Sequence, residues 1–211
     1  MHPERSEVTS SQRDLEAGFS LVELMTVAVV MIVIAAIAVP FLTHMMAAYR
    51  MASAAKSIAF QLKMTRVRAS SAFTLARLNC NNSTTPASCQ IERCQAQVGN
   101  GLCDTAPNSW AADGDAQPLP SSVAFGFGSL SKAPTGTQST IAETYQIVFN
   151  SRGLAVDVSG ATQVPTSNYA LYLRDGANPG NDDATYAITV APAGAVSVWQ
   201  YSSAVGDWGR R

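Results

Sequence analysis

The sequence predicts an α+β fold in which one long N-terminal helix packs on an antiparallel β-sheet. Three observations lead to this prediction. Residues Leu24–Leu42 form an uncharged apolar run, residues 51–69 carry an apolar face with helical spacing, and short stretches rich in β-branched and aromatic residues follow. One helix followed by a series of strands is the order typical of the α+β class.

The apolar run has the length of a membrane-spanning helix. Leu24–Leu42 comprises nineteen residues without a charge, and only Thr26 and Pro40 interrupt its apolar character. A helix of this length crosses a hydrocarbon layer of about 30 Å. Glu23 lies just inside its N-terminal end, where an unpaired carboxylate in lipid costs about 3 kcal/mol. No cation neighbours Glu23 in the sequence, so its partner must be a new amino terminus or a group of another subunit.

The helix is expected to continue beyond the apolar run as an amphipathic segment. We predict one helix from Phe19 to about Ala72, with its second half lying against a sheet. Pro40 lacks a backbone donor and is expected to kink or loosen the helix between its two halves. The apolar face of the second half consists of residues spaced by three or four: Met51, Ala55, Ile58, Leu62, Thr65 and Ala69.

Seven short strands are predicted after the helix, and Gly, Pro, Asn or Asp residues separate most of them. A segment with four cysteines and little periodicity lies between the first two strands. Residues 128–140 are predicted to form a loop that is too polar and too small-sided to build core. The expected strands are 73–78, 122–127, 144–149, 155–158, 169–174, 185–190 and 195–201.

The N-terminal motif identifies a family resemblance. The string GFSLVEL, which begins at Gly18, and the apolar run behind it resemble the class III signal of type IV pilins and type II secretion pseudopilins. In that family the prepilin peptidase cuts after the glycine and N-methylates the new first residue. The resemblance implies cleavage between Gly18 and Phe19 and methylation of Phe19. It also gives Glu23 the place of the family's assembly glutamate and Pro40 that of its helix-kinking proline.

Later segments resemble the minor pilin and pseudopilin group of GspH and FimT type. The resemblance lies in F-T-L-A-R-L-x-C after the helix and in Y-Q-I-V-F-N-S-R-G and Y-A-I-T-V-A-P-A-G-A-V-S-V, with turns at Gly153 and Gly194. Major pilins of the common type close a loop near the C-terminus with a cysteine pair. Here no cysteine follows Cys103, which favours a minor subunit.

The resemblance implies a pilin fold and a structural role. The chain is expected to be a minor pilin or pseudopilin, assembled in or at the tip of a type IV pilus-like filament. Alternatives are a type II secretion pseudopilus subunit for protein export and a pilus-associated DNA-binding subunit in DNA uptake. The implied partners are other pilins through the N-terminal helix, the prepilin peptidase, the inner-membrane assembly platform and membrane lipid.

The same resemblance implies how the chain is organised. Residues 1–18 would be the leader peptide, 19–42 the transmembrane and filament-core helix, and 43–72 the amphipathic helix half. Residues 73–211 would form a periplasmic β-rich domain with a cysteine-bearing insertion at 80–103. The protein would cross the inner membrane once before it enters a pilus or pseudopilus.

The four cysteines are expected to form disulfides. A domain outside the cytoplasm is in a compartment where disulfides persist, and neither a C-x2-C spacing nor a nearby histidine supports a zinc site. Four cysteines allow three pairings. Cys80 and Cys89 are separated by the same number of residues as Cys94 and Cys103. This spacing suits either two tandem loops or a nested pair, so the pairing stays open.

The composition argues against several functions. The formal net charge of −1 gives no support to bulk nucleic-acid binding. His2 and His44 are the two histidines, and the sequence contains no Ser/His/Asp set, metal-ligand cluster or phosphate-cradling glycine loop. We therefore expect neither catalysis nor a cofactor.

Three weaker site hypotheses remain. The loop with Asp175, Asn178, Asp182 and Asp183 offers oxygen ligands suited to calcium, and some related pseudopilins bind calcium in a late loop. The same residues favour an ordinary hairpin turn, which we prefer. Cations on the amphipathic helix are expected to meet lipid headgroups or neighbouring subunits: Arg50, Lys56, Lys63, Arg66 and Arg68.

The last of these hypotheses concerns the C-terminus. Arg210 and Arg211 lie near Trp199, Tyr201 and Trp208 in the sequence. Arginines with aromatic neighbours have the chemistry to grip phosphates and stack bases, and DNA-binding members of the FimT-like group use an arginine-bearing C-terminal segment. A solvated terminal tail is the interpretation we prefer, because chain ends are usually poorly ordered.

Overall fold

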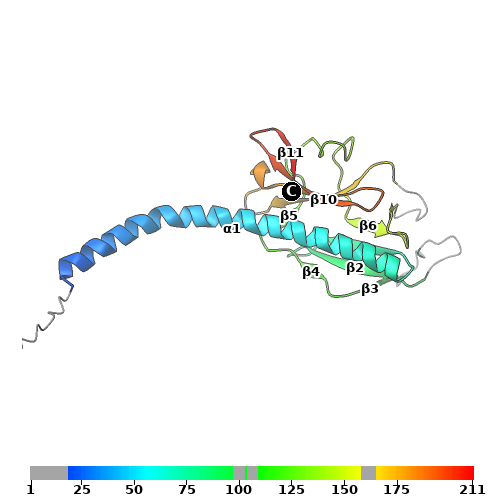
Figure 1. The fold of residues 1–211 in the computed structure, drawn as a ribbon, viewed down its shortest axis with the longest axis horizontal. Helices are drawn as coiled ribbons and strands as arrows, with labels where there is room; N and C mark the ends of the chain where they lie inside the picture. The colour runs from blue at the N-terminus through cyan, green and yellow to red at the C-terminus, as the bar shows by residue number, and fades with distance from the viewer. Residues whose placement is uncertain (1–18, 97–102, 104–108, 158–164) are drawn as a thin grey trace, which may run out of the picture. The chain divides into compact units, whose positions relative to one another are not determined.

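A computed structural model describes residues 19–96, 103, 109–157 and 165–211. These fall into two compact units, which divide between Thr43 and His44. A single α-helix, α1 (Leu21–Ser71), contributes to both units, and a β-rich region follows it in the second unit (Figure 1). The predicted α+β class is confirmed.

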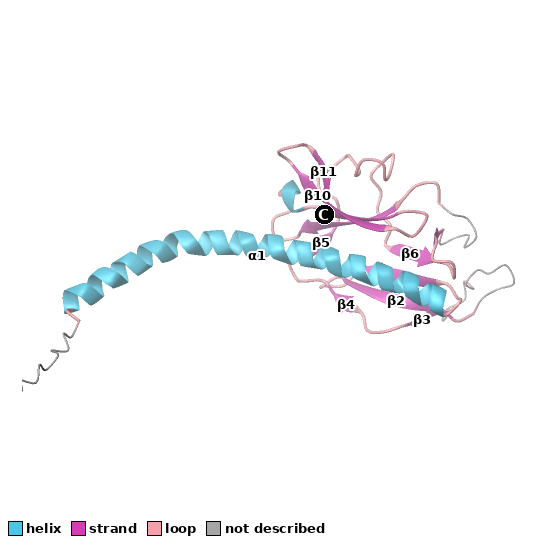
Figure 2. Cartoon of the chain, viewed as in Figure 1, coloured by secondary structure: helices cyan, strands magenta, loops and turns pink. Residues whose placement is uncertain are grey.

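The strands of the second unit form two antiparallel sheets (Figure 2). The first has the order β3-β2-β1-β6-β7, with β4 also paired to β2, and the second has the order β11-β10-β9-β8-β5. The bounds are β1 (Ala76–Asn81), β2 (Ser88–Cys94), β3 (Trp110–Ala112), β4 (Gln117–Pro118), β5 (Val123–Phe125), β6 (Gln146–Phe149), β7 (Ala155–Val156), β8 (Tyr169–Asp175), β9 (Tyr186–Val190), β10 (Val196–Ser202) and β11 (Asp207–Arg210), with a short 3₁₀ turn η1 (Asp182–Ala184).

The C-terminal half of α1 covers both sheets with one face. All six residues that the helical spacing placed on this face are at most 2% exposed, so this prediction is confirmed. The face joins Leu78 and Phe149 of the first sheet and Leu171 and Ile188 of the second in one core. Thr65 is buried with them because its hydroxyl donates to the backbone oxygen of Gln61 at 2.7 Å, which removes the cost of burying an unpaired hydroxyl.

The helix ends in a left-handed turn. Phe73 has φ of 51°, and Thr74 donates its backbone N–H to Ala69 O at 3.2 Å. This is the bond of a Schellman motif, whose left-handed position glycine normally occupies. The turn delays the first strand, so β1 begins at Ala76 rather than at Phe73 as the sequence suggested.

Several other sequence predictions need correction. The cysteine-bearing segment is not irregular throughout, because β2 lies within it and pairs along the whole of β1. Strands β3, β4 and β11 were not predicted. The other predicted strands occur within two residues of their expected ends, and Val158 lies outside the described residues.

The predicted loop 128–140 contributes to a hydrophobic cluster, contrary to expectation. Leu130 is 8% exposed and packs with Tyr172 and Trp208 on the second sheet. The indole N–H of Trp208 also donates to Lys132 O at 2.8 Å. Leu130, the backbone oxygen of Lys132 and the Gln138 side chain, which accepts from the Tyr172 hydroxyl, thus attach this polar loop to the sheet.

Two disulfides close two tandem loops. The sequence was compatible with this pairing and with a nested one. Cys80 and Cys89 face each other across β1 and β2, with a Cα–Cα distance of 4.0 Å, and both are buried. Cys94, the last residue of β2, pairs with Cys103 at a Cα–Cα distance of 5.7 Å. The first bridge thus joins two neighbouring strands, and the second attaches the segment that follows β2.

The turn at Phe73 generates a stability prediction. Phe73→Gly should raise the free energy of unfolding by about 1 kcal/mol, because glycine adopts positive φ without a clash between Cβ and the following carbonyl. Chemical denaturation of the detergent-solubilised chain measures the change. Phe73→Ala is the matched control, since it removes the same ring but keeps the Cβ; equal stabilisation by both variants would contradict the explanation.

The disulfides generate a second prediction. Replacing Cys80 and Cys89 together by alanine should lower the free energy of unfolding by about 3 kcal/mol, measured by the same denaturation. Mass spectrometry of non-reduced peptides should recover the pairs Cys80–Cys89 and Cys94–Cys103. Recovery of a nested or crossed pairing would show that the tandem order is wrong.

Candidate functional site

The N-terminal part of α1 is an apolar segment that the chain itself does not cover. Leu21–Val39 comprises 19 residues with a mean hydropathy of 2.7, and none of this span is buried. Its large side chains are between 55% and 73% exposed. Apolar surface on this scale requires a non-aqueous environment, such as lipid or the apolar surfaces of other chains.

Glu23 lies in the first turn of this segment. Its backbone oxygen accepts a bond from the Thr26 hydroxyl at 2.9 Å, but its carboxylate has no partner within the part of the chain that the structure describes. Phe19, 78% exposed, lies just before the helix. Gly18 and the remainder of the expected leader lie outside the described residues. The helix is continuous through Pro40, and a kink there stays a prediction.

Five cations of α1 were expected to face lipid or other subunits. Arg66 and Arg68 instead contact groups inside the second unit, so the expectation is wrong for these two. Arg66 donates to Gly194 O at 3.2 Å. Gly194 has φ of +79°, and a Cβ there would lie 2.2 Å from Gly153 O and 2.9 Å from Arg66 Nε. Both glycine turns therefore pack against the Arg66 side chain. Arg68 forms an ion pair with Asp113, described below.

The loop that was considered for calcium is built from turn contacts. Asp175 is buried and accepts the backbone N–H of Ala177 at 2.9 Å. Asp182 accepts the Ser129 hydroxyl at 2.8 Å, while Asn178 O accepts the backbone N–H of Asn181. Asp183 accepts two bonds from Ser203, and the backbone bond, followed by the hydroxyl bond, lowers the pKa of Asp183. The carboxylates thus serve separate contacts, and no group of three or more metal-ligating side chains occurs in the described ranges.

The C-terminus forms strand β11 in place of the poorly ordered tail that the sequence favoured, although Arg210 and Arg211 are exposed. Arg210 of β11 lies opposite Trp199 of β10, with its guanidinium carbon 6.0 Å from the ring centre, and it donates to Ser197 Oγ at 2.9 Å. Arg211 donates through Nε to Gln200 Oε1 at 3.0 Å. The two arginines are thus placed on β10 by cross-strand contacts.

A partly buried acid occurs beside the second sheet. Glu143 accepts a hydrogen bond from the Tyr145 hydroxyl, and its other carboxylate oxygen is buried without a partner among the described residues. Burial raises the pKa of Glu143, opposed by the bond from Tyr145 and the charge of Arg174. Burial and the neighbouring Glu143 raise the pKa of Tyr145 to about 12. The sequence offered no signal for this pair.

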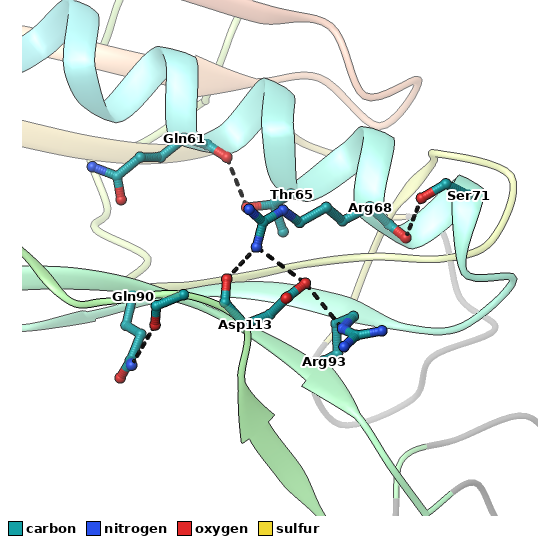
Figure 3. A network of polar contacts seen from close by, with 8 residues as sticks. Gln61, Thr65, Arg68, Ser71, Gln90, Arg93 and Asp113 are labelled. Atoms are coloured by element: carbon teal, nitrogen blue, oxygen red, sulfur yellow. Dashed lines mark hydrogen bonds and ion pairs between the residues drawn. The ribbon is translucent and has the colours of Figure 1, made fainter.

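Sequence reasoning also missed a groove beside α1. Its volume is about 290 Å³, and its walls come from the helix, from β2 and from the loop that contains Asp113 and Asp115. Figure 3 shows the ion pairs at one end of this region: Asp113 Oδ2 lies 3.1 Å from Arg68 and 2.9 Å from Arg93. The groove depends on β2 and on long-range contacts, so local sequence patterns do not reveal it.

Known proteins were compared with this chain. No protein-family model and no curated protein sequence matches it. Solved structures that are similar to it include the following two. The minor pseudopilin EpsH from the Type 2 Secretion System of Vibrio cholerae is 12% identical with a TM-score of 0.42, and the match covers 69% of this chain and 93% of EpsH. The type IV minor pilin FimU of Pseudomonas aeruginosa PAO1 is 13% identical with a TM-score of 0.39, and the match covers 76% of this chain and 92% of FimU.

Proposed function

We propose that this chain is a minor pilin or pseudopilin, a non-catalytic structural subunit of a type IV pilus-like filament. The observation that carries the proposal is one uninterrupted helix whose first 19 residues are unburied and, apart from Glu23 and Thr26, apolar, and whose start overlaps the Gly-Phe-x-x-x-Glu motif of residues 18–23. Such a helix has to be kept in lipid or covered by other chains. A filament built from parallel apolar helices provides that cover.

Processing supplies the partner that Glu23 lacks. Cleavage between Gly18 and Phe19 by the prepilin peptidase would create a charged amine on Phe19, which is then N-methylated. In a filament, this amine of one subunit would pair with Glu23 of its neighbour. Removing either partner leaves an uncompensated buried charge, which costs about 3–5 kcal/mol, so the pair would select the correct axial position of each subunit.

The organisation that follows has four parts. Residues 1–18 are the leader, 19–42 cross the inner membrane and later enter the filament core, and 43–72 attach the β-rich domain. Residues 73–211 form that domain in the periplasm. Release from lipid into the filament core keeps the apolar surface covered throughout. The assembly platform of the inner membrane would carry out this transfer.

Two related functions compete with a pilus role. A type II secretion pseudopilus subunit for protein export would carry the same signal and helix. Deletion of the gene separates the two, because loss of secretion indicates the pseudopilus and loss of piliation or twitching indicates the pilus. A DNA-uptake subunit is favoured only by Arg210 and Trp199, whose side chains meet on β10 and β11.

Processing and assembly give the principal test. The mature chain should begin with N-methylated Phe19 by mass spectrometry, and Glu23→Ala should reduce its amount in sheared filaments at least tenfold while leaving it in the membrane. Thr26→Ala, in the same segment, is the control and should be retained. A mature N-terminus elsewhere, or full incorporation of Glu23→Ala, would contradict the proposal.

The DNA-binding alternative has its own test. If the C-terminal strand binds DNA, Arg210→Ala with Arg211→Ala should weaken binding of the purified chain to double-stranded DNA at least tenfold in gel shifts, since each phosphate contact adds to affinity. Lys56→Ala with Lys63→Ala removes the same charge from α1 and serves as the control. Equal losses, or no binding by the unaltered chain, would exclude a site at the C-terminus.

A further inference from the structure

An apolar stripe runs along the exposed side of α1 in the second unit. At 3.6 residues per turn its five members fall within about 60° of one another around the helix axis, opposite the face that packs on the sheets. Four of them are between 51% and 76% exposed, and Met64 is half-buried. Apolar surface of this kind marks a site of contact with another molecule. The stripe consists of Met46, Tyr49, Phe60, Met64 and Val67.

The shape of the stripe fits a second helix. From Met46 to Val67 it is about 30 Å long at 1.5 Å per residue, and Ser53 lies between its two halves. Side chains repeated every three or four residues interdigitate with those of another helix, which can stay in contact along the whole stripe. The same arrangement recurs after five turns of α1, because eighteen residues separate the corresponding positions: Met46 from Met64, and Tyr49 from Val67.

The charged side chains that α1 places beside the stripe are all cations. By helical geometry, Lys56 and Lys63 lie along one edge and Arg50 along the other. All three are exposed, and none has an ion-pair or hydrogen-bond partner in the part of the chain that the structure describes. In contacts between helices, the charges that flank the apolar side chains determine which partner is accepted. A partner helix therefore needs carboxylates beside its apolar residues.

A second copy of this chain does not offer an acidic helix of this kind. Glu23 is the one acid of α1, and it lies outside the second unit. Asp115 is exposed, but it belongs to the loop wall of the groove beside α1. Helix-to-helix contact between two copies would therefore bring cations together, which opposes association. The flanking charges thus disfavour this chain as its own neighbour, in accord with a minor subunit.

We propose that the stripe docks an amphipathic α-helix of a different subunit, whose apolar side chains cover the stripe and whose Asp or Glu residues face Lys56 and Lys63. The cations select the partner, because they attract an acidic helix and repel a basic one. Phe60 and Met64 also line the groove beside α1, so the docked helix covers that edge of the groove as well. The inference rests on the proposed function, since a filament is the setting that places this chain beside other subunits.

Site-specific photo-crosslinking in the full chain tests the contact. A benzoylphenylalanine in place of Phe60, which is exposed and outside the core, should link to a different protein on irradiation of intact cells. Mass spectrometry should map the link to a helix with Asp or Glu beside the linked position. The same photo-residue at Val205, exposed between β10 and β11, should not reach that helix. A product of twice the subunit mass, a link to lipid or to a segment of other chemistry, or no product would overturn the proposal.

A charge exchange provides the second arm. Lys56→Glu with Lys63→Glu should lower the crosslink yield at least fivefold, because the partner's carboxylates would then meet like charges. Lys56→Arg with Lys63→Arg is the matched control, which keeps both charges and should retain the yield. Changing the partner's mapped carboxylates to lysine should restore the crosslink of the glutamate variant. An unchanged yield in the glutamate variant, an equal loss in the arginine variant, or failure of the exchange would refute the predicted pairing.

The same samples separate this contact from the proposed function, since they also report the mature N-terminus and the amount of the chain in sheared filaments. A processed, incorporated chain without the crosslink at position 60 contradicts the docked helix alone. A chain that gives the crosslink but never enters filaments supports the contact and contradicts the proposed function.

Discussion

Helix α1 has to satisfy two environments with one hydrogen-bonded backbone. An α-helix makes its backbone bonds internally, so it is stable in lipid and in water alike, and only its side chains need to change along its length. Apart from Glu23 and Thr26, Leu21–Val39 are apolar on all sides, whereas from Met51 onward the buried residues are confined to one face. The arrangement of the second unit follows from the need to cover that one face.

Both sheets contribute to this cover, and small residues on the helix make it possible. Ala54, Ala55, Ala59 and Ala69 are all buried in the shared core, so the strands can approach the helix backbone closely. The contact of Arg66 with the glycine turns adds a polar attachment at the helix edge. Larger side chains at Gly153 or Gly194 would clash with Arg66 or with the neighbouring turn. The apolar packing of α1 and the contact of Arg66 with the two glycine turns therefore both hold the sheets against the helix.

The one acidic group of α1 is left without a partner among the described residues. The Glu23 carboxylate lies in the first turn of an apolar, unburied segment, where an unpaired charge is costly. Under the proposed processing, the new amine at Phe19 of a neighbouring subunit would supply its partner. The same segment therefore needs other molecules both to cover its apolar surface and to pair its one carboxylate.

The sequence by itself determined the elements that depend on local periodicity. The apolar run, the buried face of α1 and the order of helix before strands follow from local patterns: an uncharged apolar stretch, residues spaced by three or four, and short stretches rich in β-branched and aromatic residues. The N-terminal motif by itself predicts the function that the unburied apolar helix then supports. Tertiary structure decided what depends on distant partners. Strand β2 lies in a polar cysteine-bearing segment and forms by pairing with β1, and β11 is ordered by β10. The cysteine pairing and the groove beside α1 arise in the same way, because segments distant in sequence create them only when the chain has folded.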